Sequence, residues 1–427
     1  MQLRARTMES SNIPKIISWW VTPKLPKEHV FIKPKDRPKG IMDIVRVYFI
    51  KWLIHPIKRR LAKYYLIFLK RFFGLKVIAI TGSAGKTSTK EMVASILRIC
   101  GSTVSSYANI DPIYNIPTTI LRCSSKTKYL VLEMGVEYPG EMDYYLWLIT
   151  PDIGAITNIY PTHTEFLGDI RGVFKEKSKL AKSLSVDSVF ILNSEDPWLV
   201  KLKDKIKARV VSFGSGTEVA FSNERINKDY KTQFILTFDQ NQDKQVEITL
   251  PVFGKQFIVS ALCASAIGKA LGISLETIKK GLAGFSVPEH RMTLLKHKSG
   301  ALILDDSYNN NPAAAKAAVN TLKEFKGARK IIVFGDMLEL GDWEKKYHLE
   351  IGEAIGKIHP DKLICIGHAS FNTATSAAKI IGEERVVSFS SWQEALPEIK
   401  KELKPGTTIL IKGSRSIGLD KLVSALF

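Results

Sequence analysis

Residues 76–87 read Lys76-Val-Ile-Ala-Ile-Thr-Gly-Ser-Ala-Gly-Lys-Thr87, and this stretch decides the fold. Its first part is a short apolar run typical of a strand buried in a parallel sheet. The glycine-rich part follows at once, and a helical pattern of apolar residues then continues to Leu97. Strand, loop and helix in this order predict an α/β domain whose first loop binds phosphate.

The predicted phosphate loop comprises Gly82, Ser83, Ala84, Gly85, Lys86, Thr87 and Ser88. Glycines let backbone N–H groups converge on phosphate oxygens, and the N-terminus of the next helix adds partial positive charge. Lys86 is expected to reach the outer phosphates of a nucleotide, and Thr87 offers a hydroxyl to Mg²⁺. Two residues separate the glycines, whereas the common P-loop has four, so an ordinary strand-to-helix turn is the alternative interpretation.

Beyond this loop, apolar strands alternate with helices. Strands are predicted at 129–134, 153–159 and 188–192, helices at 170–184 and 259–271, and a strand-rich excursion at 218–250. A second run of five strands is predicted at 301–304, 330–334, 362–366, 386–389 and 408–411. We therefore predict a central ATP-binding domain at 76–287 with a mainly parallel sheet, and a doubly wound, Rossmann-like C-terminal domain at 288–427.

Three residues outside the loop are candidates for a metal site. Glu133 ends an apolar run, where a carboxylate can join a Mg²⁺ held by a neighbouring loop. His163 follows another predicted strand, but histidine is a soft ligand for Mg²⁺, so a hydrogen-bonded structural histidine is the alternative. Lys177 lies in Phe174-Lys-Glu-Lys-Ser178 and by itself indicates a solvated helix lysine.

The composition is that of a folded protein, with 45% hydrophobic and 24% charged residues, and it argues against a disordered, collagenous or polytopic membrane chain. At about 150 residues per domain, 427 residues indicate two to three domains. The four cysteines lie far apart and include no C-x-x-C pair, so a reducing compartment is expected.

The net charge of +20 is concentrated near the N-terminus, where residues 1–76 carry 18 Lys and Arg against four acidic residues. Aromatic residues such as Trp19, Trp20 and Trp52 are interleaved with these cations in a predicted basic helical extension, residues 1–75. Charged residues interrupt every window of about 18 residues, so we expect no membrane span, and the order of charged, apolar and small residues is not the one expected of a secretory signal. We favour an amphipathic helix on an anionic membrane surface. A helix packed on the body and nucleic-acid binding are the alternatives, and the latter is the least favoured.

Four segments in order resemble the Mur ligase family of ATP-dependent amide-forming enzymes, over about residues 76–427. They are the Thr-Gly-x-x-Gly-Lys-Thr loop at 81–87, Asp305-Asp-Ser-Tyr-Asn-Asn-Asn-Pro312, Gly335-Asp-Met-Leu-Glu-Leu-Gly341 followed by His348, and Lys412-Gly-Ser-Arg415. The short spacing between the loop glycines is the family's own variant of the P-loop.

The resemblance implies an ATP- and Mg²⁺-dependent ligase of peptidoglycan synthesis that adds D-alanyl-D-alanine to a UDP-N-acetylmuramoyl tripeptide. The peptide carboxylate takes the γ-phosphoryl group of ATP, and the incoming amine attacks the acyl phosphate. The implied enzyme is a cytoplasmic monomer, placed peripherally at the inner face of the membrane if residues 1–75 bind there.

The resemblance also implies residue roles. One Mg²⁺ would be held by Thr87 and Glu133, and a second by His163, with Lys177 carbamylated to a carboxylate-like ligand. Arg291, Asp306 and Asn309 would close over the nucleotide, about a hinge near 288–291. Lys412 and Arg415 would orient the acyl phosphate or the acceptor.

The chain departs from the family pattern in three places. Residues 1–75 do not resemble the family's UDP-binding domain, Gln256-Phe-Ile-Val-Ser260 replaces a His-Asn-x-x-Asn pattern near the adenine, and the loop at 109–117 follows the acceptor pattern only in part. Two alternatives therefore stand beside the implied function. One is a ligase for a lipid-linked or other cell-envelope peptide, and the other is a non-catalytic nucleotide-binding module tethered by its basic extension.

Overall fold

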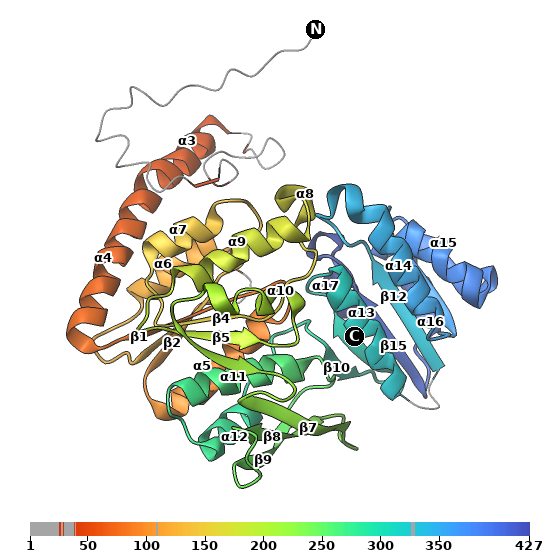
Figure 1. The fold of residues 1–427 in the computed structure, drawn as a ribbon. Helices are drawn as coiled ribbons and strands as arrows, with labels where there is room; N and C mark the ends of the chain where they lie inside the picture. Colours follow the sequence, from red (N-terminus) through yellow and green to blue (C-terminus); the bar gives the residue numbers. More distant parts are fainter. Residues whose placement is uncertain (1–24, 27–28, 30–37, 39, 108–109, 326–328) are drawn as a thin grey trace.

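The computed structural model of the protein describes residues 25–26, 29, 38, 40–107, 110–325 and 329–427. Over these residues the chain forms two sheets covered by helices, with a long helical stretch at the outer edge of the first sheet's layer (Figure 1). The predicted α/β architecture is confirmed.

The first sheet has nine strands in the order β2-β3-β1-β4-β5-β6-β7-β8-β9. Their bounds are β1 Lys76–Thr81, β2 Thr103–Ser105, β3 Tyr129–Glu133, β4 Ile153–Ile156, β5 Val189–Asn193, β6 Arg209–Phe213, β7 Val219–Ile226, β8 Thr232–Phe238 and β9 Gln245–Leu250. Neighbours from β2 to β7 are parallel, and β7, β8 and β9 are antiparallel. The antiparallel part is the strand-rich excursion that the sequence predicts.

Helices cover both faces of this sheet. They are α5 Lys86–Cys100, α6 Pro112–Leu121, α7 Glu141–Leu148, α8 Thr164–Leu167, α9 Ile170–Ser183, α10 Pro197–Val200, η3 Lys203–Lys205, α11 Phe257–Ala270 and α12 Leu275–Ala283. Alternate residues of β1 face opposite sides, as the pleat requires. Ile78 and Ile80 join the core under α5, α11 and α12, whereas Val77 and Ala79 join the core under α6, α7 and α9.

The second sheet has six strands in the order β10-β11-β15-β12-β13-β14. Their bounds are β10 Thr293–Lys296, β11 Leu302–Asp306, β12 Arg329–Gly335, β13 Lys362–Ile366, β14 Val386–Phe389 and β15 Thr407–Lys412. Five run parallel, and β10 pairs antiparallel with β11 at one edge. The sequence predicts five strands here and misses β10, because this strand has only four residues, three half-buried and one exposed, which is too short a pattern.

Helical segments flank the second sheet. They are α13 Pro312–Thr321, η4 Leu322–Glu324, η5 Gly341–Trp343, α14 Glu344–Gly356, α15 Ser370–Ile381, η6 Glu383–Arg385, α16 Trp392–Lys401, η7 Arg415–Ile417 and α17 Leu419–Leu426. Helix α13 lies on the side of the second sheet that faces the helices of the first sheet, so the two halves of the molecule meet there (Figure 1).

The basic extension is helical where the structure describes it. Helix α3 Ile41–Phe49 continues through a π-helical turn, η2 Ile50–Ile54, into α4 His55–Phe73, which ends at the left-handed Gly74 with φ 66°. Ala62, Leu66 and Leu69 are buried in the core shared with α6, so α4 is bound to the body. The predicted aromatic residues Trp19 and Trp20 lie outside the described residues.

Candidate functional site

The phosphate loop joins the end of β1 to the start of α5. Gly82 has φ 146°, and a Cβ there would lie 1.9 Å from Thr157 Oγ1 at the end of β4. Gly85 has φ 77°, in the left-handed region that favours glycine. Both glycines therefore serve the shape of the loop, and the alternative of an ordinary strand-to-helix turn does not account for so close an approach.

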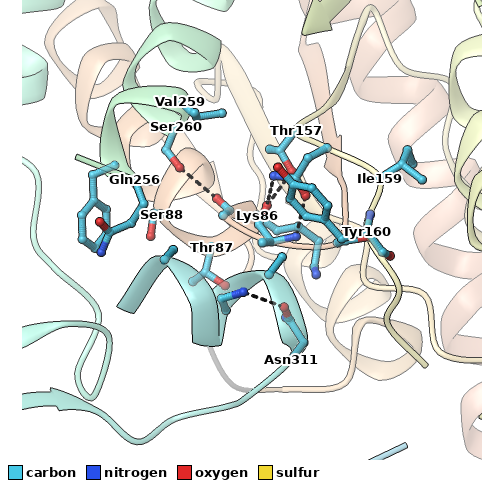
Figure 2. Close-up of a pocket in the computed structure, with 18 of the residues that line it drawn as sticks. Lys86, Thr87, Ser88, Thr157, Ile159, Tyr160, Gln256, Val259, Ser260 and Asn311 are labelled. Atoms are coloured by element: carbon cyan, nitrogen blue, oxygen red, sulfur yellow. Dashed lines mark hydrogen bonds between the residues drawn. The ribbon is translucent and has the colours of Figure 1, made fainter. Parts of the chain in front are cut away.

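The residues after β4 hold the loop in place. Asn158 Oδ1 accepts a hydrogen bond of 2.8 Å from Ala84 N, and Thr157 Oγ1 donates one of 2.6 Å to Ala84 O. Ser83 Oγ donates to Tyr160 O at 2.8 Å. Figure 2 shows Thr157 and Tyr160 beside Lys86, with dashed lines between the two segments. The loop backbone is thus fixed before any ligand binds.

A cavity of about 620 Å³ opens over this loop, and both layers of the molecule contribute to its wall. The half of the molecule built on the nine-stranded sheet contributes the loop, Glu133, 157–160 and the start of α11. The half built on the six-stranded sheet, with the linker before it, contributes Arg291, Asp306, Tyr308, Asn309, Lys412 and the start of α13. Figure 2 shows the first turn of α13, capped by Asn311, facing the loop, with Gln256 at the far side. This nucleotide-side cavity is large enough for a small cofactor.

Lys86 points back across the loop, where its ammonium donates to Gly82 O at 3.0 Å. Burial lowers the pKa of Lys86, while the nearby Glu133 carboxylate raises it and Arg291 lowers it. Arg291 Nε is buried and has no hydrogen-bond partner among the described residues. Two cations thus converge on one cavity wall, which suits a polyphosphate.

Thr87 Oγ1 donates a hydrogen bond of 3.0 Å to Glu133 Oε1 on the neighbouring strand. A hydroxyl and a carboxylate are hard oxygen donors of the kind that Mg²⁺ prefers. Within the described ranges no three His, Cys, Asp or Glu side chains form a metal-ligand group. The donor set therefore fits a Mg²⁺ that keeps most of its ligands on phosphate and water rather than a cage made by the protein.

A second cavity of about 430 Å³ adjoins the first and shares Ser83, Lys86, Tyr308, Asn309 and Asn311 with it. Its remaining lining residues are Glu137, Thr162, His163, Asn310, Leu338, Glu339, Leu340, Ser414, Arg415 and Ser416. We call it the acceptor-side cavity. Because Lys86 lines both spaces, a group held in one lies next to a group held in the other.

His163 stands at the wall of the acceptor-side cavity with a left-handed backbone, φ 54°. Its Nδ1 and Glu339 Oε2 lie 2.6 Å apart, a contact that joins the two layers. Thr164 Oγ1 strengthens the same junction by donating to Leu340 O at 2.9 Å. A histidine whose Nδ1 is occupied by a carboxylate presents Nε2 to a metal, which is the usual arrangement of a metal-binding histidine.

Charged residues of the second sheet meet at the carboxyl ends of the neighbouring strands β11 and β15. Lys412 Nζ donates to Asp306 Oδ2 at 2.6 Å and to Asn309 O at 2.9 Å. The guanidinium groups of Arg291 and Arg415 lie 4.2 and 4.9 Å from the ring centroid of Tyr308. Two of the cations that the sequence names from this half, Arg291 and Arg415, therefore lie against one tyrosine ring, and Lys412 pairs with Asp306.

Lys177 lies in α9 and is 1% exposed. Burial, together with the charge of Lys86, holds the pKa of Lys177 well below its usual value. The interpretation as a solvated helix lysine is therefore wrong. Lys177 lines neither of the two cavities, so among the predicted metal ligands it stands apart from the Thr87 and Glu133 pair.

Several residues of the site escape the sequence analysis. Asn158 lies in the predicted strand 153–159 and Tyr308 in the family segment 305–312, so the sequence marks both segments without assigning a role to either residue. Glu339 pairs with His163, a residue 176 positions away. Gln256, which the sequence places near the adenine, does line the nucleotide-side cavity, but its contact with Thr321, whose Oγ1 donates to Gln256 Oε1 at 3.3 Å, has no sequence signal. Pairing over such distances leaves no local pattern.

Comparisons with known proteins identify the family of the chain. Family models described as "Mur ligase middle domain" and "Mur ligase, glutamate ligase domain" match residues 80–268 and 290–415. The UDP-N-acetylmuramoyl-tripeptide--D-alanyl-D-alanine ligase of Bacillus subtilis (strain 168) is 32% identical over 374 residues, covering 86% of this chain and 78% of that protein. The Escherichia coli (strain K12) protein of the same name is 32% identical over 363 residues, covering 82% and 76%. The crystal structure of MurF from Acinetobacter baumannii superposes with a TM-score of 0.78 at 29% identity, covering 87% of this chain and 80% of that chain. The chain belongs to the Mur ligase family.

Proposed function

We propose that the protein is an ATP- and Mg²⁺-dependent peptide ligase that adds D-alanyl-D-alanine to UDP-N-acetylmuramoyl tripeptide in peptidoglycan synthesis. The observation that carries this proposal is the pair of adjoining cavities that share Lys86. One has the loop, the cations and the oxygen donors that a magnesium nucleotide needs, and the other borders the position of its outermost phosphate. The relatives in Bacillus subtilis and Escherichia coli are named for this reaction.

The nucleotide-side cavity positions the phosphates. When bound, MgATP supplies the phosphoryl group that activates the peptide carboxylate. The loop amides and Lys86 hold the outer phosphates, while Thr87 and Glu133 hold Mg²⁺. Arg291, Asp306 and Asn309 face the same space from the second layer. Catalysis of this kind depends on position and charge neutralisation, and these fixed groups supply both.

The acceptor-side cavity places the reacting carboxylate and amine. Arg415 supplies positive charge at its wall, and Lys412, which lines the adjoining cavity, supplies positive charge beside the shared boundary. His163, oriented by Glu339, offers Nε2 to a second Mg²⁺. Positive groups here stabilise the charge that develops on the acyl phosphate oxygens.

Lys177 acts, in this proposal, as a carbamate. Burial lowers the pKa of Lys177 and so favours its neutral amine, and a neutral amine reacts with CO₂ to give a carbamate with loss of one proton. The carbamate gives Lys177 a negative charge, which the positive charge of Lys86 favours. It thereby supplies a carboxylate-like metal ligand.

We propose further that 76–287 and 288–427 are two domains that close on the nucleotide. The contacts of His163 with Glu339 and of Thr164 with Leu340 support a junction between them. We also propose that the ligase is a cytoplasmic monomer, attached peripherally to the inner face of the membrane. The apolar face of residues 41–73 supports that attachment.

Phosphate release from ATP and Mg²⁺ tests the reaction, with UDP-N-acetylmuramoyl tripeptide and D-alanyl-D-alanine offered together and then singly. We expect turnover only with both. If a lipid-linked muramoyl peptide supports turnover and the UDP-linked one does not, the protein is still a ligase but its acyl donor is the lipid-linked peptide. Lys86→Ala is the control, because it should abolish all substrate-dependent turnover of a ligase. A non-catalytic nucleotide-binding tether would show no turnover in either the parent or the variant.

A further inference from the structure

Large apolar side chains gather on the outer surface of the N-terminal helical stretch. Of the 25 large hydrophobic residues that are exposed in the described part of the chain, 14 lie within residues 41–73. The other 11 are spread along residues 99–427. Single exposed apolar residues are normal, whereas a contiguous patch marks an interaction site.

Helix α4 has two apolar faces. Its inner face buries Ala62, Leu66 and Leu69 against the body. On the opposite side a second stripe is exposed at a spacing of three or four residues: Ile57, Leu61, Tyr64, Phe68 and Phe72. At 100° per residue these five positions fall within one narrow sector of the helix. Packing on the body therefore leaves the whole second stripe uncovered.

The stripe continues toward the N-terminus without changing side. Ile41, Val45, Phe49 and Leu53 are exposed at steps of four residues. A step of four drifts by about 40° around an α-helix. The π-helical turn Ile50–Ile54, between α3 and α4, takes up additional residues per turn and so turns the apolar positions of α3 toward the side of the α4 stripe. The result is one apolar band along α3, η2 and α4, which lie along the outside of the molecule (Figure 1).

The band is bordered by positive charge. Residues 41–73 contain eight Lys and Arg and one acidic residue, Asp43. Several of these cations also fix the helix to the body: Lys58 donates to Thr118 Oγ1 at 2.8 Å, and Lys70 lies 3.0 Å from Asp152. Arg46 and Arg71 are exposed beside the band. The complementary surface is therefore apolar at its centre and negative at its rim.

These properties select among the possible partners. A second copy of this face would bring two strongly positive surfaces together, and their like charges oppose that contact. An anionic lipid surface offers headgroups for the cations and an acyl layer for Phe, Leu and Ile. Among the described residues, no helix combines the length and the hydropathy needed to span a bilayer.

We infer that residues 41–73 dock in the plane of an anionic phospholipid bilayer, with the exposed stripe of α3, η2 and α4 inserted at the level of the headgroups. The inference rests on the proposed peripheral location and names its partner. The helix lies in the interface rather than across it, and the opposite face of α4 keeps the ligase body on the membrane surface.

Co-sedimentation of the full chain with vesicles tests the docking. The probes are vesicles of phosphatidylglycerol with phosphatidylethanolamine, and vesicles of phosphatidylcholine alone. We expect binding to the anionic vesicles that weakens steeply with salt, and at least tenfold weaker binding to the zwitterionic ones. Equal binding to both would overturn the anionic partner, and binding to neither would overturn the docking.

Two variants and one control locate the contact. Leu61→Glu/Phe72→Glu places two carboxylates on the stripe and is expected to weaken vesicle binding at least tenfold, and Arg46→Glu/Arg71→Glu is expected to do the same by reversing charge. Phe371→Glu, at a residue 60% exposed on α15, is the matched control for Phe72, which is 69% exposed, and should bind as the parent does. Equal loss in the control would contradict the assignment of the face.

Turnover with soluble substrates separates this inference from the proposed function. Both helix variants should retain the parent's ATP- and D-alanyl-D-alanine-dependent turnover, because the band lines neither cavity. Full turnover without vesicle binding by the parent overturns the docking alone, and vesicle binding without turnover overturns the ligase alone. Light scattering tests the remaining candidate partner, a second copy of the chain. If the parent is a dimer and Leu61→Glu/Phe72→Glu is a monomer, the band is a self-association surface and the docking on lipid is overturned.

Discussion

Lys412 and Asp306 form a hydrogen-bonded ion pair of 2.6 Å between neighbouring strands of the second sheet. The two residues are partners in the register of β15 and β11, at the carboxyl ends of both strands. Lys412 is 1% exposed and also donates to Asn309 O, so its ammonium is held by two acceptors away from solvent. Both residues line the nucleotide-side cavity. The pair therefore links the stability of the second sheet to the shape of the site.

Replacing Lys412 with Met should cost stability and turnover together. The half-buried Asp306 carboxylate loses its ammonium partner and keeps the hydrogen bond from Met292 N, and breaking one side of such a pair costs up to about 3 kcal/mol of unfolding free energy. Substrate-dependent turnover should fall more than a hundredfold, because a cation leaves the cavity wall. Urea unfolding and phosphate release measure the two effects.

Lys400→Met is the control for that substitution, since Lys400 is an exposed lysine of α16. It should change the unfolding free energy by no more than about 0.5 kcal/mol. Asp306→Asn should cost less than Lys412→Met, because the amide oxygen still accepts from the ammonium. A Lys412→Met chain as stable as the parent would show that the pair carries no stability.

Gly82→Ala should abolish nucleotide binding. The new Cβ would lie 1.9 Å from Thr157 Oγ1, and φ 146° is a conformation that alanine rarely adopts. The loop would have to shift, and its amides would leave their positions. Titration calorimetry with ADP measures the loss, and Gly140→Ala is a matched control at φ 93° with no atom within 4 Å of the new Cβ. Parent-like ADP affinity in Gly82→Ala would contradict the role of this loop.

The parts of the fold that the sequence predicts are those with a strong local pattern. The apolar strand, the glycines and the helix at 76–97 lie together in the chain and form one unit, so periodicity finds them. Strand β6, Arg209–Phe213, and the edge strand β10 were missed because short, partly exposed strands carry little pattern. Lys177 was misread for a related reason: its neighbours are polar, and only the packing of α9 buries it.

The contact of Glu339 with His163 should control metal binding in the acceptor-side cavity. Glu339 accepts at Nδ1, fixes the ring and raises the basicity of Nε2, so its replacement by Gln should weaken the apparent Mg²⁺ affinity by about 10- to 100-fold. The Mg²⁺ dependence of turnover measures this, and excess Mg²⁺ should restore part of the rate. Glu350→Gln, on the exposed side of α14, is the control. An unchanged Mg²⁺ profile in Glu339→Gln would mean that the contact only joins the two layers.

Lys177→Met should make the protein more stable and less active. Burial lowers the pKa of Lys177 in the folded chain, and the charge of Lys86 lowers it further, whereas the unfolded chain keeps the usual value of 10.5. Between those two values the unfolded state binds a proton that the folded state does not, so the stability of the parent rises with pH at up to about 1.4 kcal/mol per pH unit. Above 10.5 both states are neutral and the penalty disappears.

In CO₂-free buffer the stability advantage of Lys177→Met should therefore shrink as the pH rises toward 10.5. Urea unfolding across that range measures the trend. Lys175→Met, an exposed position on the same helix, should show no such trend. Bicarbonate should stabilise the parent and leave Lys177→Met unchanged, because only the parent has an amine to carbamylate. A stability gap that stays constant with pH would show that Lys177 is protonated in the folded protein, and a protonated amine cannot react with CO₂.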